Sequence, residues 1–86
     1  MSSPLDGLRA QITANDEAIV AAVNERIRLV AELWKLKREI GADQLDPGRE
    51  HALRDELAAV NTGPLSADGL DRLVSELLAL TKRELA

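Results

Sequence analysis

Two cationic side chains interrupt an apolar face in the first half of the sequence. Residues that follow one another in steps of three and four lie on one face of a helix. One such face reads Leu8, Ile12, Asn15, Ile19, Ala22, Arg26, Val30, Leu33 and Lys37. Arg26 and Lys37 therefore align to within about 20° and lie about 16 Å apart along the helix. Because an unpaired charge on an interior face is costly, the pair predicts an anionic partner.

A third cation, Arg9, has a different relation to this face. It precedes Arg26 by seventeen residues, which places it about 100° around the helix and about 25 Å away along the axis. Arg9 therefore cannot share a site with Arg26 of its own helix, but it can share one with Arg26 of an antiparallel partner helix. That geometry requires a dimer with two equivalent sites.

Two later apolar stripes also carry polar groups. Arg49 heads a stripe that continues at Leu53, Leu57 and Val60, and Glu50 lies beside it. Thr81 interrupts a stripe made of Leu70, Leu73, Val74, Leu77, Leu78 and Leu85. Each charge alone could be a structural ion pair or a snorkelling side chain. Several cations together favour a ligand that is small, multiply negative and partly apolar, because guanidinium groups make charge-assisted contacts with carboxylates.

Three helices must position these groups, and we expect them at about 4–40, 47–60 and 67–85. Each expected helix follows a residue that favours the N-cap, and the first two continue into proline. These start signals are Ser3, Pro4, Asp46, Pro47 and Ser66. The stop signals are Gly41 and the segment 61–64, which contains Gly63 and Pro64.

The first helix is too long for the rest of the chain to cover. It would measure about 55 Å, and only about 45 residues follow it. Long uninterrupted helical patterns indicate association between helices, and small chains often need oligomerisation to build a core. The sequence thus predicts one all-α domain over residues 1–86 that forms an intertwined homodimer. An extended monomeric hairpin is the alternative.

The composition narrows the classes of function. The net charge of −4 disfavours binding to nucleic acid, which usually requires a basic surface, but it leaves an anionic ligand possible because local charge decides the local field. There is no cysteine and one histidine, His51, so we expect no metal site. No apolar run is long enough to span a membrane, and the start Met1–Pro4 does not resemble a secretory signal. We expect a cytoplasmic protein.

Four further residues are expected to pack or to face solvent and not to belong to a site. Trp34, the single aromatic residue, is expected to pack in the core or the dimer interface. His51 is expected on the solvent side of the second helix. Lys82 and Arg83 are expected on a solvated face of the third.

Ordered motifs along almost the whole chain, Leu5 to Leu85, resemble the all-helical (AroQ-type) chorismate mutase family. The first helix contains Leu8-Arg9-Ala10-Gln11-Ile12, Asp16-Glu17-Ala18-Ile19, Glu25-Arg26, Val30-Ala31 and Lys37 at the family's spacing. The second begins with Asp46-Pro47-Gly48-Arg49-Glu50, which is similar to the family's D-x-x-R-E. The resemblance implies rearrangement of chorismate to prephenate, in phenylalanine and tyrosine biosynthesis, without a cofactor.

The resemblance also implies roles for the cations of the first helix. Arg9 would come from the partner subunit and bind the substrate carboxylates together with Arg26. Lys37 would donate to the ether oxygen of the bond that breaks.

The remaining implied roles fall on the other two helices. Arg49 would be a buried supporting cation near the pyruvyl carboxylate. Glu50, with the backbone around Asp46, would hold the ring hydroxyl. Thr81 would replace the family's usual serine near the ring carboxylate.

Leu85 departs from the family pattern, which often has a glutamine there as a second donor to the ether oxygen. The ending is similar to a short actinobacterial-type subclass whose members are weak alone and are activated by the first synthase of the shikimate pathway. The resemblance therefore implies a possible complex with that synthase. Isochorismate pyruvate lyase, aminodeoxychorismate mutase and a non-catalytic regulatory or adaptor dimer remain alternatives.

Overall fold

The computed structural model describes residues 3–43 and 46–86. It consists of α1 (Pro4–Ile40), α2 (Pro47–Val60) and α3 (Ala67–Leu85). These bounds match the helices expected from the sequence. The expectation about a secretory signal falls partly on Met1 and Ser2, which lie outside the described residues. Two residues of the expected break between α1 and α2, 44 and 45, also lie outside them.

The start signals act as the sequence predicts. The side chains of Ser3, Asp46 and Ser66 each accept a hydrogen bond from a backbone N–H three residues later, which satisfies one of the free donors at each helix start. Gly41 ends α1 in the left-handed conformation with φ of 73°, which glycine adopts without steric cost. The three helices are therefore delimited by local chemistry.

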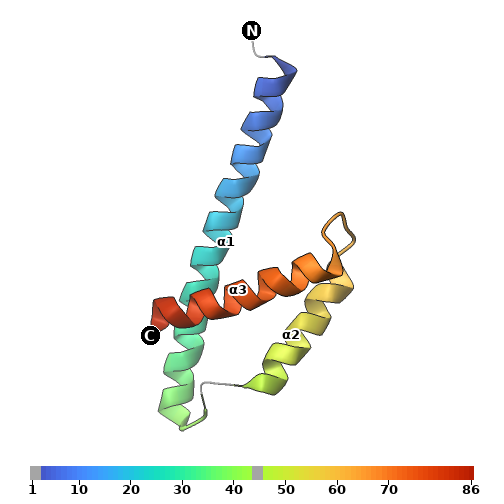
Figure 1. Ribbon diagram of the computed structural model, residues 1–86. Coiled ribbons are helices and arrows are strands. Elements are labelled where there is room, and N and C mark those ends of the chain that lie inside the picture. Colours follow the sequence, from blue (N-terminus) through green and yellow to red (C-terminus); the bar gives the residue numbers. More distant parts are fainter. Residues whose placement is uncertain (1–2, 44–45) are drawn as a thin grey trace.

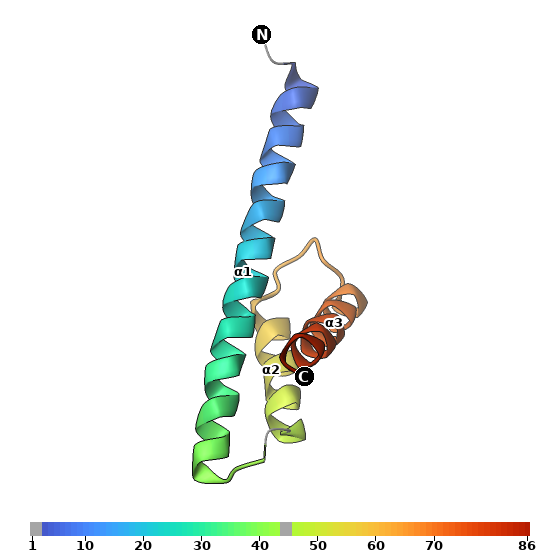
Figure 2. The ribbon, with the colours of Figure 1, turned by 90° about the vertical axis from the view of Figure 1, so that its left-hand side faces the viewer.

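The helices form an extended shape of 59 × 24 × 18 Å. Both views show α1 along the whole length, with α2 and α3 gathered near its C-terminal half (Figures 1 and 2). α3 packs against α1 and also against α2. The N-terminal half of α1 projects beyond the other two helices (Figure 1).

Burial follows this uneven arrangement. Among the described residues, Val74 and Thr81 of α3 are the two that are buried, with 2% and 3% of their surface exposed. In the projecting half of α1, large apolar side chains are each more than half exposed. They are Leu5, Leu8, Ile12, Ile19 and Val20. In the C-terminal half, Val30, Trp34 and Lys37 are partly buried, while Leu29, Leu36 and Ile40 are more than half exposed. The chain therefore shields one face of the C-terminal half of α1 and leaves the apolar stripe of the N-terminal half open.

No helix in the described part of the chain is both long enough and apolar enough to cross a membrane.

Candidate active site

A cavity of about 280 Å³ lies among the three helices. Its polar lining consists of Arg26, Lys37, Asp46, Arg49, Glu50, Thr81 and Lys82. Its apolar lining consists of Val30, Leu33, Trp34, Leu53 and Leu78. Except for Arg9, every residue that the sequence nominates for a site therefore lies at one cavity.

α1 brings Arg26 and Lys37 to the cavity together, as their spacing predicts. Both side chains are partly buried. Val30 and Leu33, which lie between them on the same face, line the cavity wall. The interior cations of the sequence pattern thus point into one partly apolar space.

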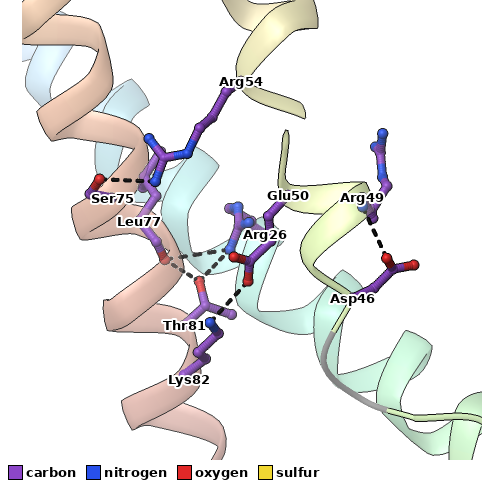
Figure 3. Close-up of polar contacts among 9 residues, drawn as sticks. All are labelled: Arg26, Asp46, Arg49, Glu50, Arg54, Ser75, Leu77, Thr81 and Lys82. Carbon is purple, nitrogen blue, oxygen red and sulfur yellow. Dashed lines mark hydrogen bonds and ion pairs between the residues drawn. The ribbon is translucent and has the colours of Figure 1, made fainter. Parts of the chain in front are cut away.

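α3 fixes the orientation of Arg26. The Arg26 guanidinium donates to the Thr81 hydroxyl, and its Nη1 lies 3.5 Å from the Leu77 carbonyl oxygen. The Thr81 hydroxyl in turn donates to the Leu77 carbonyl at 2.7 Å. Figure 3 shows this chain of contacts from α1 to α3. Because Thr81 is buried, Arg26 is held by a contact that water reaches poorly, and its remaining N–H groups are available to a ligand.

α2 brings two carboxylates to the cavity. Asp46 caps α2, with its Oδ1 accepting from the Arg49 N–H at 3.0 Å. Glu50 forms an ion pair with Lys82, with 2.9 Å between Oε1 and Nζ. Negative groups in the first turn of a helix are stabilised by its dipole, so the start of α2 suits both of them.

The structure corrects the expectation for Lys82. It lies not on a solvated face but at the cavity, bound to Glu50 across the gap between α3 and α2 (Figure 3). The sequence carries a signal for this placement, because Leu78, four residues earlier and so on the same helix face, also lines the cavity. Trp34 is likewise a cavity-lining residue, in addition to the packing role expected of it.

Arg49 is not the buried cation that was expected. Its side chain is 58% exposed in the protomer and pairs with Glu56 of the same helix at 3.5 Å. Figure 3 shows it apart from the group formed by Arg26, Thr81 and Glu50. The physical reason is that Arg49 lies in the first turn of α2, where its long side chain reaches along the helix surface toward Glu56.

Arg9 is exposed on the projecting half of α1 and is not among the residues that line the cavity. This agrees with the helix geometry, which separates Arg9 from Arg26 of the same chain. Its contribution from a partner subunit stays a prediction. His51 lies on the solvent side as expected, with a side chain 79% exposed and 3.5 Å from Asp55.

Sequence reasoning missed a contact that joins α2 to α3. Arg54 Nη1 lies 2.6 Å from Asp71 Oδ1, and Arg54 Nη2 donates to Ser75 Oγ at 2.9 Å. The partners lie 17 and 21 residues away on another helix, so no periodicity within α2 could reveal them. The contact matters for the site because α2 carries Glu50 and α3 carries Thr81.

The charges of the lining favour a dianion. Four cationic side chains and two carboxylates of the described chain line the cavity, so their formal charges leave an excess of two positive charges. A cavity with cations on rigid helices and an apolar wall can hold a small dicarboxylate in one orientation.

Comparisons with known proteins point to one family. The family model for chorismate mutase type II matches residues 8–84. A solved structure of chorismate mutase from Thermus thermophilus (Form I) is 29% identical, with a TM-score of 0.88, covering 92% of this chain and 99% of that chain. Form II from the same organism is 28% identical, with a TM-score of 0.89, covering 94% and 92%. No curated protein matches the chain significantly.

These findings confirm the resemblance and the all-helical fold. They do not support the expected complex with the first synthase of the shikimate pathway, which stays a prediction. Because the family model extends over nearly all of the three helices, the chain belongs to the chorismate mutase type II family.

Proposed function

We propose that this chain rearranges chorismate to prephenate in the cavity among α1, α2 and α3, and that a second copy of the chain completes the cavity with its Arg9. The observation that carries the proposal is the convergence of Arg26 and Lys37 on one cavity with Thr81 and Glu50 from the other helices. The cavity volume of about 280 Å³ suits a small substrate.

Arg26 binds a substrate carboxylate. A guanidinium held by Thr81 and Leu77 loses little freedom when a carboxylate docks on its remaining donors. Chorismate carries one carboxylate on its ring and one on its enolpyruvyl side chain, and Arg9 from the second copy engages the carboxylate beyond the reach of this chain's own α1.

The reaction is an intramolecular rearrangement in which one carbon–oxygen bond breaks and one carbon–carbon bond forms. No proton or electron passes to the protein. The protein therefore has to hold the chair-like conformer and stabilise the charge that develops on the ether oxygen. The apolar wall of Val30, Leu33 and Leu78 holds the ring and excludes water, and the Lys37 ammonium donates to the ether oxygen.

The start of α2 binds the polar edge of the ring. Glu50 accepts a hydrogen bond from the ring hydroxyl, next to the backbone around Asp46. Arg49 turns from Glu56 toward the pyruvyl carboxylate. Breaking its contact with Glu56 costs about 1 kcal/mol or less, because both side chains are mostly exposed.

The second copy is supported by the open half of α1. That half carries five exposed large apolar side chains and Arg9. An antiparallel copy of α1 would cover the apolar stripe and bring its Arg9 to the cavity, and the two-fold relation would give two equivalent sites.

The test follows chorismate absorbance and prephenate formation with the purified full chain, alone and with the first synthase of the shikimate pathway added. Isochorismate and aminodeoxychorismate serve as comparison substrates. We expect saturable formation of prephenate from chorismate. Absence of prephenate under both conditions, or faster turnover of a comparison substrate, would contradict the proposal.

A further inference from the structure

Lys82 and Glu50 form the ion pair that joins two helices across the cavity. Lys82 lies near the C-terminal end of α3 and Glu50 in the first turn of α2. Their charged atoms are 2.9 Å apart, and their side chains are 43% and 34% exposed. Both line the cavity, so the pair is part of the wall that a ligand meets (Figure 3).

A carboxylate in this position poses an electrostatic problem. The lining charges favour a dianion, yet Glu50 would repel one, and the repulsion between like charges grows as water is excluded. Lys82 neutralises that charge. The Lys82 ammonium contacts Oε1 of Glu50. Because a carboxylate can accept several hydrogen bonds, Glu50 can still accept one from a hydroxyl group.

We propose that Lys82 is a positioning residue that acts through Glu50: it fixes and neutralises the Glu50 carboxylate so that the cavity accepts a substrate with two negative charges and a hydroxyl group. The inference rests on the function proposed above and adds a residue to it. Because the hydroxyl contact exists in the bound substrate and in the transition state alike, Lys82 affects KM and leaves kcat nearly unchanged.

A purely structural role explains the pair less well. Arg54 already ties α2 to α3 through Asp71 and Ser75. Partly exposed ion pairs contribute little to stability. Lys82 also lies on the same face of α3 as Leu78, and both residues line the cavity.

The experiment compares Lys82→Met and Lys82→Arg with the control Arg83→Met. Arg83 is the next residue, its side chain is 65% exposed, and it pairs with Glu76 at 4.0 Å. It does not line the cavity, so its loss removes one charge from the same helix turn without changing the cavity. We expect Lys82→Met to raise KM about tenfold with kcat within about twofold. Lys82→Arg and Arg83→Met should keep KM within about twofold of the original chain.

The pathway through Glu50 is tested by repeating Lys82→Met in a Glu50→Gln background. If Lys82 acts through Glu50, the second substitution should change KM by less than about twofold. A tenfold rise in both backgrounds would overturn the inference and assign Lys82 a direct contact with substrate. A fall in kcat of the same size as the rise in KM, or an unchanged KM in Lys82→Met, would also overturn it.

Binding measured by Trp34 fluorescence separates this inference from the proposed function. Trp34 is the single aromatic residue and lines the cavity, so its emission reports chorismate binding without turnover. If the chain binds chorismate without rearranging it, and Lys82→Met alone among the three variants weakens binding about tenfold, the proposed function fails and the role of Lys82 stands. If chorismate leaves Trp34 emission unchanged and is not turned over, both fail.

Discussion

The two halves of α1 carry similar apolar stripes but have different surroundings. In the C-terminal half, α3 packs on the stripe, and Arg26 and Lys37 line a cavity. In the N-terminal half, Ile12 and Ile19 are each more than half exposed and Arg9 is exposed. This half projects beyond α2 and α3 (Figure 1). One half of α1 contributes to a cavity within the chain, and the other half is an exposed surface that we propose a second copy covers.

This difference teaches that the protomer is not the functional unit we propose. Apolar surface of this extent on one helix stabilises an assembly when a second copy covers it. A cation on the open half can then serve the neighbour's cavity, while the cations on the packed half serve their own. Substitutions in the two halves should therefore impair different properties of the protein, namely turnover for the packed half and association for the open half.

The largest effect is expected from Lys37→Ala in the packed half. Loss of a charge-assisted donor to the transition state should lower kcat by about 10²–10³, with little change in dimer mass or helix content. Steady-state kinetics and circular dichroism check this. The matched control is Lys35→Ala, which removes the same charge from an exposed neighbouring position that does not line the cavity. A Lys37→Ala variant that keeps the original kcat would show that Lys37 is not the donor to the ether oxygen.

The next effect is expected from Ile12→Asp in the open half. A charge placed on the apolar stripe should raise the dissociation constant of the dimer by about a hundredfold, because the carboxylate would lose water on association. Sedimentation at several concentrations measures this. Ala14→Asp adds the same charge on the opposite face of the helix and should leave the dimer intact. An Ile12→Asp chain with undiminished association would show that this stripe is not the interface.

A smaller effect is expected from Thr81→Val. Valine keeps the volume but removes the hydroxyl acceptor of the Arg26 guanidinium and leaves it only the Leu77 carbonyl at 3.5 Å. This loss should cost about 1.5–3 kcal/mol of unfolding free energy and raise KM a few-fold. Chemical denaturation and kinetics measure the two quantities. Ser75→Ala is the control, since its hydroxyl also accepts from an arginine, Arg54, away from the cavity. Equal effects on KM would contradict the role given to Thr81.

The sequence predicted the helices well because their boundaries depend on local chemistry. Ser3, Asp46 and Ser66 form caps, and Gly41 adopts the left-handed conformation that ends α1. The convergence of Arg26 and Lys37 followed from helix periodicity alone. These features need no knowledge of how the helices pack.

The features that escaped prediction depend on contacts between helices. Lys82 was assigned to a solvated face although it shares a helix face with Leu78, because nothing within α3 reveals its partner Glu50 on α2. Arg49 was expected to be buried, yet its side chain pairs with Glu56 along the helix surface. The direction of a long side chain depends on its partners, and those become visible only when the helices are placed in space.

The most direct test of the central claim is complementation between two impaired variants, Arg9→Ala and Lys37→Ala, each inactive or nearly so alone. If Arg9 serves the partner's cavity, a dimer with one chain of each kind has one intact site. Co-expression or mixing of unfolded chains followed by refolding should then restore about one quarter of the original sites, since half of the dimers are mixed and each has one good site of two. Recovery to about that level is the predicted result, and a mixture no more active than its separate components would contradict the account.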